Sequence, residues 1–164
     1  SIRDGFLDMT VCNRSNDLIW GCCGANAVHM SYLQEYIASM CGVDMGFYTQ
    51  FTHNLHAYLD TLTPLKDMPP DYDSYAVRQI EYQTPLMTYP KTFDEELKIF
   101  MVGQMRRDFK NKIFSEVALP MWKLWTAWKT KSYLECMDAL SEIKSEDWHI
   151  ACKEWIDRRK DKLK

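Results

Sequence analysis

The spacing of apolar residues changes its period twice within the first sixty residues of this chain. Residues 6–12 alternate with a period of two, which indicates a β-strand. Residues 25–41 carry apolar side chains at every third or fourth position, which predicts an amphipathic helix, and Gly42 provides a natural stop. Residues 45–59 are rich in aromatic residues and threonine, as strands are. This order of strand, helix and strand favours the α/β class.

The C-terminal third of the chain is expected to be helical, and an irregular connection precedes it. Prolines break residues 60–92, where residues 76–82 are long enough for one short strand. Tryptophans at positions 122, 125 and 128 are expected to form a core stripe. We therefore predict a twisted mixed sheet with one long buried helix and a helical C-terminal third. The helices expected in that third are residues 93–102, 115–129, 132–143 and one beginning at Ser145.

Composition excludes several classes of protein. Hydrophobic residues make up 46% of the 164, so a packed core is expected and disorder is not. The net charge of −3 provides no electrostatic footprint for a long nucleic-acid duplex. No apolar run approaches the roughly 20 residues that span a membrane. The six cysteines include no Cys-x-x-Cys pair, so neither a zinc ribbon nor another metal site is expected, and free thiols suggest a cytoplasmic protein.

A polar cluster follows the first predicted strand. The guanidinium of Arg14 and the hydroxyl of Ser15 suit a phosphate, which charge-assisted hydrogen bonds would hold. The alternative is an exposed arginine beside a turn serine. Asp17 precedes an apolar tripeptide, where a carboxylate can accept hydrogen bonds from a heterocycle or simply shape a turn.

Two further positions carry side chains that could bind other parts of a nucleotide. The amide of Asn26 can donate and accept, which suits the edge of a nucleobase, although the same residue type caps helices. His56 and Tyr58 lie two residues apart, so on a strand both face the same way. They suit a sugar hydroxyl, or else form a half-buried polar face of a strand.

Taken in order, these residues resemble the thymidylate synthase family. Residues 13–17, Asn-Arg-Ser-Asn-Asp, are followed by Gly21, by Asn26 at the start of a helix and by His56-x-Tyr58. The amino-acid sequence of these motifs is most similar to a divergent branch of the family that is found in phages. This branch includes deoxypyrimidine hydroxymethylases. The resemblance covers residues 3–60, and the spacing of four separate motifs makes it specific.

The resemblance implies a role for each matching residue. Arg14 and Ser15 would bind the 5′-phosphate of a deoxypyrimidine monophosphate, and Asn26 would read the pyrimidine edge. His56 and Tyr58 would hold the ribose 3′-hydroxyl. Asp17 would hold the pterin of 5,10-methylenetetrahydrofolate. The family also implies a homodimer formed sheet to sheet.

The sequence also departs from the family pattern. The nucleophilic cysteine of a Pro-Cys-His motif is absent, because Cys12 lies too close to Arg14 and has neither neighbour. Covalent activation of the ring needs such a nucleophile, so we expect it upstream of residue 1. Asn13 stands where glutamine is usual, and one extra residue separates Gly21 from Asn26.

Three functions follow as expectations. The first is thymidylate synthase-like transfer of a one-carbon unit to carbon 5 of deoxyuridine monophosphate. The second is hydroxymethylation of deoxyuridylate or deoxycytidylate, and the third is a nucleotide-binding remnant without catalysis. We expect a single domain over residues 1–164 that lacks an N-terminal portion. Residues 1–60 would form the nucleotide-site core, and residues 93–164 the helical part.

Overall fold

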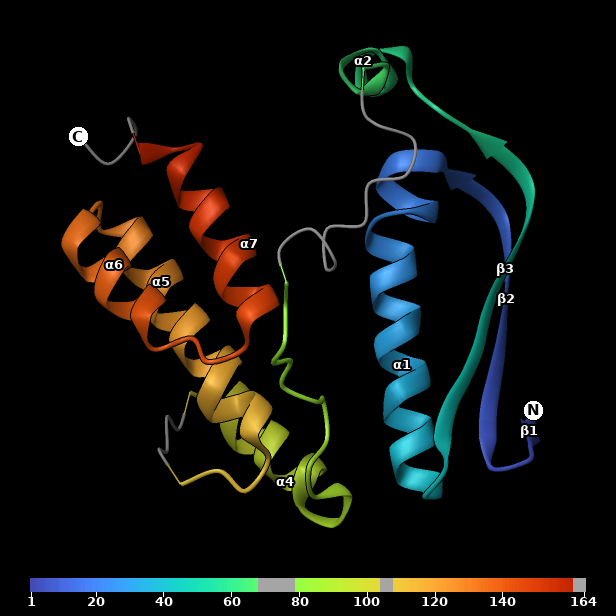
Figure 1. Ribbon diagram of the computed structural model, residues 1–164, viewed down its shortest axis with the longest axis horizontal. Coiled ribbons are helices and arrows are strands. Elements are labelled where there is room, and N and C mark those ends of the chain that lie inside the picture. Colours follow the sequence, from blue (N-terminus) through green and yellow to red (C-terminus); the bar gives the residue numbers. More distant parts are fainter. Residues whose placement is uncertain (68–78, 104–107, 161–164) are drawn as a thin grey trace. The chain divides into compact units, whose positions relative to one another are not determined.

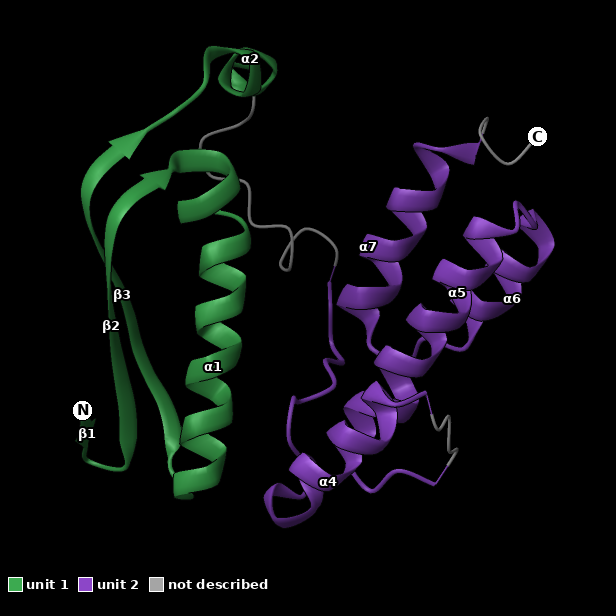
Figure 2. Cartoon of the chain, turned by 180° about the vertical axis from the view of Figure 1, so that it is seen from behind, with its two compact units in different colours: residues 1–72 green, residues 73–164 purple. Residues whose placement is uncertain are grey.

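The computed structural model describes residues 1–67, 79–103 and 108–160. The chain divides into two compact units, an N-terminal unit of residues 1–72 and a C-terminal unit of residues 73–164 (Figure 2). Mixed α/β architecture with a helical C-terminal part is confirmed. Whether the two units make up a single domain stays a prediction.

The N-terminal unit contains a mixed three-stranded sheet (Figure 1). Its strands are β1 (Ile2–Arg3), β2 (Phe6–Asp17) and β3 (Asp44–His56), in that order. β1 pairs antiparallel with β2 through a tight turn at Asp4 and Gly5, which both have positive φ. β2 and β3 are parallel, and α1 (Ala25–Cys41) connects them.

β2 is longer than its apolar pattern predicts. The prediction placed residues 13–17 beyond the strand end, but these residues continue the ladder with β3. Asn13 pairs with Thr52, and Asp17 with His56. The polar side chains therefore lie on a strand, because the partner strand keeps supplying backbone hydrogen bonds after the apolar alternation stops.

α1 begins and ends close to where the spacing predicts. Gly42 caps its C-terminus with φ 68°, the left-handed conformation that glycine adopts without strain. The helix lies along both long strands, where Gln34 Nε2 donates to Leu7 O at 2.7 Å and, more weakly, to Gly46 O at 3.3 Å. The prediction of a buried helix is too strong. Across α1, all of which the structure describes, Gln34 and Ala38 are buried, because a sheet with two long strands covers only one face.

Short helical turns follow β3. α2 (Leu59–Leu62) leads into a 3₁₀ turn at Thr63–Leu65. Part of the short strand predicted at residues 76–82, residues 76–78, falls outside the described residues. Residues 79–82 are described and form no strand, so for them the prediction is wrong. Helices resume with α4 (Pro90–Met101), which confirms the helix predicted at residues 93–102.

The other predicted helices of the C-terminal third are also present. A π-helical turn (Phe114–Ala118) runs into α5 (Leu119–Lys129), and α6 (Tyr133–Ser141) and α7 (Glu146–Asp157) follow. α5 and α6 lie side by side (Figures 1 and 2). The core between these helices consists of Leu124, Ala127, Cys136, Ala139, Leu140, Ile143, Cys152 and Ile156.

The tryptophan stripe is less buried than predicted. Trp122 and Trp125 are 46% and 48% exposed, whereas Trp128 packs edge-on against Trp155 with ring centroids 4.7 Å apart. The reason is geometric. Each step of three residues moves the side chain about 60° around a helix, so a strict three-residue spacing leaves the core face.

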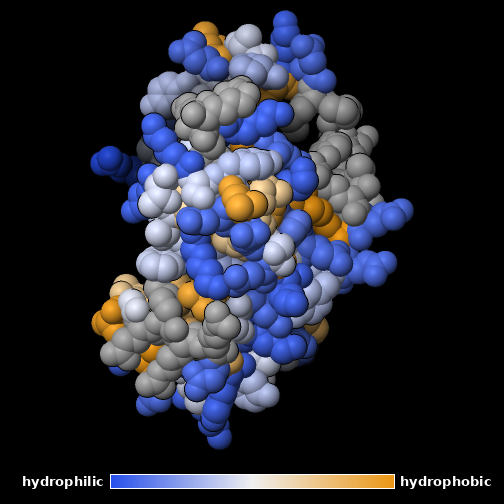
Figure 3. Space-filling model, turned by 90° about the vertical axis from the view of Figure 1, so that its left-hand side faces the viewer, coloured by the Kyte–Doolittle hydropathy of each residue, from blue (hydrophilic) through white to orange (hydrophobic). Residues whose placement is uncertain are grey.

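Hydrophilic residues dominate the face of the molecule drawn in Figure 3, where hydrophobic residues form small separate patches. Within the described residues, no helix is long and apolar enough to cross a membrane.

Candidate functional site

The six predicted site residues lie at one end of the N-terminal unit. Arg14, Ser15 and Asp17 are the last residues of β2, and His56 is the last residue of β3. Tyr58 follows two residues later, and Asn26 opens α1. Since β2 and β3 are parallel, their carboxyl ends meet at one edge of the sheet. Ligands of open α/β sheets bind outside the carboxyl ends of the strands.

Ser15, His56 and Tyr58 form one local group. Ser15 Oγ lies 3.5 Å from His56 Nδ1, and Asn54 Nδ2 donates weakly to Ser15 Oγ at 3.4 Å. The rings of His56 and Tyr58 meet edge to face, with centroids 5.6 Å apart. The three residues therefore present two hydroxyls and an imidazole together, which is a suitable set for binding a sugar or phosphate oxygen.

Asn26 points its amide at β2. Its Nδ2 donates to Asn16 Oδ1 at 2.8 Å, while Gly24 is the N-cap of α1 and no side chain caps that end. The helix-cap alternative for Asn26 is therefore wrong. Gly21 makes the Asn16–Asn26 contact possible. A Cβ at Gly21 would lie 2.0 Å from Asn16 Oδ1 and 3.1 Å from Asn26 Nδ2.

Asp17 has one engaged oxygen and one unsatisfied oxygen. Oδ1 accepts from the backbone N–H groups of Ile19 at 3.0 Å and Trp20 at 2.6 Å, which caps a π-helical turn (Leu18–Cys22). Such turns are rare and frequently occur at functional sites. Oδ2 is buried and has no hydrogen-bond partner among the described residues. An unsatisfied buried carboxylate oxygen is costly, so it is a natural acceptor for a donor on a ligand.

Arg14 is the exposed cation of the site. It has no carboxylate partner in the described part of the chain. Neighbouring residues of a strand point to opposite faces, so Arg14 and Ser15 can reach one phosphate only beside the edge of β2. That edge has room for it, because β1 pairs with β2 only at Phe6 and Leu7 among the described residues.

Residues outside the predicted set also belong to the site. Asn16 is 2% exposed, and its Nδ2 donates to Gln50 Oε1 at 3.1 Å. Gln50 Nε2 in turn donates to the backbone carbonyl of Cys22 at 2.8 Å. Gln50 lies in a run of aromatic and threonine residues on β3, and its amide was the one signal in that run that could have marked it.

The Cys23 thiol does not have the features of an activated nucleophile. Burial, the charge of Cys22 and a hydrogen bond with Cys22 raise the pKa of the Cys23 thiol above its usual value. A higher pKa reduces the thiolate fraction at neutral pH and therefore the reactivity. Cys12 is exposed on β2, two residues before Arg14.

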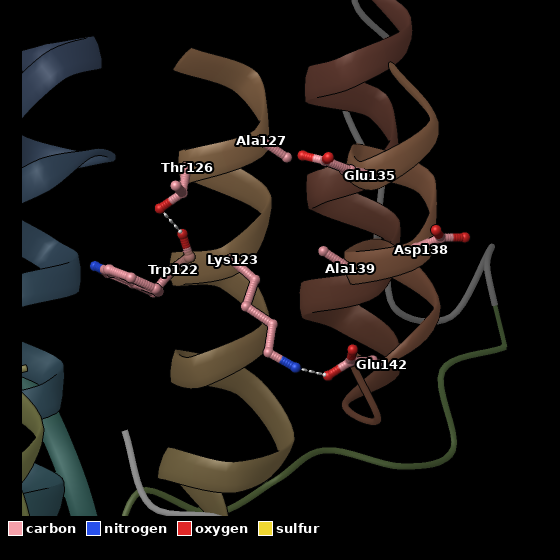
Figure 4. Close-up of a pocket in the computed structure, with 8 residues that line it drawn as sticks. All are labelled: Trp122, Lys123, Thr126, Ala127, Glu135, Asp138, Ala139 and Glu142. Atoms are coloured by element: carbon pink, nitrogen blue, oxygen red, sulfur yellow. Dashed lines mark hydrogen bonds and ion pairs between the residues drawn. The ribbon is translucent and has the colours of Figure 1, made fainter. Parts of the chain in front are cut away.

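A second concave region lies on the C-terminal unit. A groove of about 270 Å³ runs between α5 and α6, with Trp122 on one side and the carboxylates of Glu135 and Asp138 on the other (Figure 4). Lys123 forms an ion pair with Glu142 in this groove. Glu135 and Asp138 have no cationic partner in the part of the chain that the structure describes, and carboxylates of this kind repel a phosphate. The groove therefore does not compete as the nucleotide site. No group of three or more His, Cys, Asp or Glu side chains within the described ranges could hold a metal ion.

Two phage proteins are similar to this chain in sequence. A deoxyuridylate hydroxymethyltransferase of Pseudomonas phage M6 is 42% identical over 171 aligned residues, which cover 96% of this chain and 49% of that protein. This chain is its homologue. A deoxyuridylate hydroxymethyltransferase of Bacillus phage SP01 is 51% identical over 59 residues, 36% of this chain and 15% of that protein. No family model matches, and no solved structure matches either.

Deoxyuridylate hydroxymethyltransferase is a member of the thymidylate synthase family, so the family resemblance predicted from the motifs is confirmed. The chain spans about half the length of its M6 homologue.

Proposed function

We propose that this chain binds deoxyuridine monophosphate and is the nucleotide-holding part of a one-carbon transferase. The observation that carries the proposal is the gathering of the motif residues at the carboxyl edge of β2 and β3. Arg14 and Ser15 bind the 5′-phosphate, and His56 and Tyr58 hold the 3′-hydroxyl. Asn26 meets the base. The names of the two phage relatives, both deoxyuridylate enzymes, support the same substrate.

The cofactor of the proposal is 5,10-methylenetetrahydrofolate, which when bound supplies the one-carbon unit. The fit rests on Asp17, whose buried Oδ2 lacks a partner among the described residues. A pterin carries N–H donors that would satisfy this oxygen, while Oδ1 keeps capping the turn at residues 18–22. Asp17 thereby joins the folate position to the strand that carries the phosphate ligands.

The product proposed is the hydroxymethyl nucleotide. Both relatives are named hydroxymethyltransferases, which favours this alternative over thymidylate synthesis. In hydroxymethylation the oxygen of a water ends on the transferred carbon, whereas thymidylate synthesis requires a hydride from the folate. The alternative outside the enzymes is a protein that binds the nucleotide without catalysis. The proposed fold is thymidylate synthase-like, with β2, β3 and α1 as the nucleotide-site part of its sheet.

Titration calorimetry with three ligands tests the binding proposal. Deoxyuridine monophosphate should bind more tightly than deoxyuridine, because the phosphate adds charge-assisted hydrogen bonds to Arg14. Deoxycytidine monophosphate should bind more weakly than its uracil counterpart. No heat of binding with any of them would contradict the proposal for this chain.

The 164-residue chain alone is expected to turn over no substrate. It carries no Pro-Cys-His motif, and the raised pKa of Cys23 makes that thiol a poor substitute. The measurement is tritium release from deoxyuridine monophosphate labelled at carbon 5, with methylenetetrahydrofolate present and the M6 homologue as positive control. Clear release by the chain would contradict the prediction, and serine variants of Cys12, Cys22 and Cys23 would then locate the nucleophile.

We also propose that a second copy covers the sheet face opposite α1. Phe47 and Phe51 are 83% and 66% exposed on that face. Phe6 on β2 and Met45 and Leu55 on β3 are further exposed apolar residues of the sheet. Contiguous exposed apolar surface of this kind marks an interaction site, and a sheet-to-sheet dimer of this family would bury it.

Charge on that face is expected to break the dimer. Replacing Phe47 and Phe51 together by aspartate should shift the mass measured by light scattering from dimer to monomer, because the charges would be buried without partners. Leu134→Asp is the control, since Leu134 is 73% exposed on α6. An unmodified chain that stays monomeric at high concentration would contradict the proposal.

A further inference from the structure

Three amide side chains of the N-terminal unit form one hydrogen-bonded chain. Gln50 Nε2 donates to Cys22 O at 2.8 Å, Asn16 Nδ2 donates to Gln50 Oε1 at 3.1 Å, and Asn26 Nδ2 donates to Asn16 Oδ1 at 2.8 Å. The chain starts from a backbone carbonyl and ends at the residue that meets the base in the proposed function. We call it the amide relay, defined as Gln50, Asn16 and Asn26.

The direction of the amide relay is fixed at its start. A backbone carbonyl can only accept, so Gln50 must turn its NH₂ group to Cys22 and its oxygen to Asn16. Asn16 must then donate to Gln50 and offer its oxygen to Asn26. Flipping any one amide would bring two oxygens or two NH₂ groups face to face. Because Asn16 is 2% exposed, water cannot readily rescue a flipped arrangement.

The same neighbourhood leaves Asn16 little room to move. Gly21 lies so close that a Cβ there would sit 2.0 Å from Asn16 Oδ1. The NH₂ group of Asn26 is therefore held toward Asn16. The Oδ1 atom of Asn26 accepts no hydrogen bond among the described residues. The Oδ1 atom and the second N–H group of the Asn26 amide can therefore bind a ligand, and each has a fixed position.

We propose that Gln50 and Asn16 are specificity-determining positioning residues, which orient the Asn26 amide and so select uracil over cytosine. The proposal rests on the proposed binding of deoxyuridine monophosphate. Uracil presents an N3–H donor and an O4 acceptor, and cytosine presents an N3 acceptor and a 4-amino donor. A freely rotating amide serves both bases by flipping, whereas an amide held by the relay serves one.

Gln50→Met tests the relay, because methionine keeps the shape of glutamine and removes both of its hydrogen bonds. We expect the preference for deoxyuridine monophosphate over deoxycytidine monophosphate, measured by calorimetry, to fall about tenfold, the value of one hydrogen bond. Most of the change should be a gain for the cytosine nucleotide. In the nuclear magnetic resonance spectrum of the chain without nucleotide, the side-chain amide signals of Asn16 and Asn26 should shift and exchange faster with water.

Gln34→Met is the matched control. Gln34 is a second glutamine of the same unit and lies on the face of α1 that packs against the sheet. Its Nε2 donates to the backbone carbonyls of Leu7 and Gly46, at the end of the strands opposite the proposed site. Its replacement should lower the melting temperature and leave both the nucleotide preference and the Asn26 amide signals unchanged. Asn16→Asp is a second relay variant, since aspartate accepts from Asn26 but cannot donate to Gln50. It should retain the preference for uracil despite a loss of stability.

The outcomes separate the relay from the proposed function. If the unmodified chain prefers the uracil nucleotide and Gln50→Met leaves both that preference and the Asn26 amide signals unchanged, the relay does not position Asn26 and the inference is overturned. Equal losses for both nucleotides would overturn it too, since they indicate a purely structural role. If the unmodified chain binds neither nucleotide, the proposed function fails together with the specificity role. The amide signals then still decide whether the relay orients Asn26.

Discussion

Replacing Arg14 by alanine is expected to weaken the binding of deoxyuridine monophosphate roughly 10- to 100-fold, because a hydrogen bond to a charged group contributes about 1.5–3 kcal/mol. Arg14 is exposed at the end of β2, and no carboxylate among the described residues neutralises it. Arg14→Lys should cause a smaller loss, since lysine keeps the charge without the bidentate geometry. The measurement is titration calorimetry across the three proteins.

Two comparisons make the Arg14 prediction specific. Deoxyuridine lacks the phosphate, so its affinity should hardly change in either variant. Arg3→Ala is the matched control. Arg3 is another exposed arginine of the same sheet, paired with Asp8 at 3.3 Å at the far end of β2. Its loss should leave nucleotide binding unchanged. If Arg14→Ala weakens nucleotide and nucleoside equally, Arg14 supports the fold and the assignment of the phosphate site fails.

Local signals made much of the fold predictable. The period of α1 and the glycine after it placed the helix over residues 25–41, and Ser132 and Ser145 marked the starts of α6 and α7. The order of the motifs along the chain carried the family resemblance, and the set of site residues taken from that resemblance stays a prediction. The parallel pairing of β2 and β3 brings two members of the set together. Ser15 and His56 are 41 residues apart in sequence yet lie 3.5 Å apart.

Contacts that depend on strand register were not predictable. Asn16 meets Gln50 only because β2 and β3 pair in one particular alignment, which neither sequence segment reveals alone. The same ladder explains why β2 extends to Asp17 after its apolar alternation has ended. The exposure of Trp122 was mispredicted for a different reason. The prediction placed tryptophan in the core because of its residue type and did not follow the rotation of side chains around the helix.

Replacing Glu96 by alanine is expected to lower the free energy of unfolding of the C-terminal unit by about 3 kcal/mol or more. Glu96 is 9% exposed on α4, and its carboxylate accepts from the backbone N–H groups of Lys110 at 2.7 Å and Asn111 at 3.0 Å. It also accepts from Asn111 Nδ2 at 2.7 Å. Asn111 is fully buried, so removing the carboxylate leaves donors unsatisfied at about 1–3 kcal/mol each. Glu95→Ala, the same change at the exposed neighbour, should stay within about 0.5 kcal/mol.

The pH dependence of this effect has a definite sign. Burial alone would raise the pKa of Glu96, but the hydrogen bonds from Asn111 and the Lys110 backbone outweigh it, so the pKa lies below its ordinary value. The stabilisation is complete above the pKa of an unfolded glutamate, about 4.3, and is lost as the pH falls from there through the lower folded pKa. Urea unfolding of the chain and of Glu96→Ala at successive pH values should show the gap between them narrowing over that acidic range. A gap of constant size at every pH would mean that the side-chain bulk of Glu96, rather than its charge, holds α4 against Asn111.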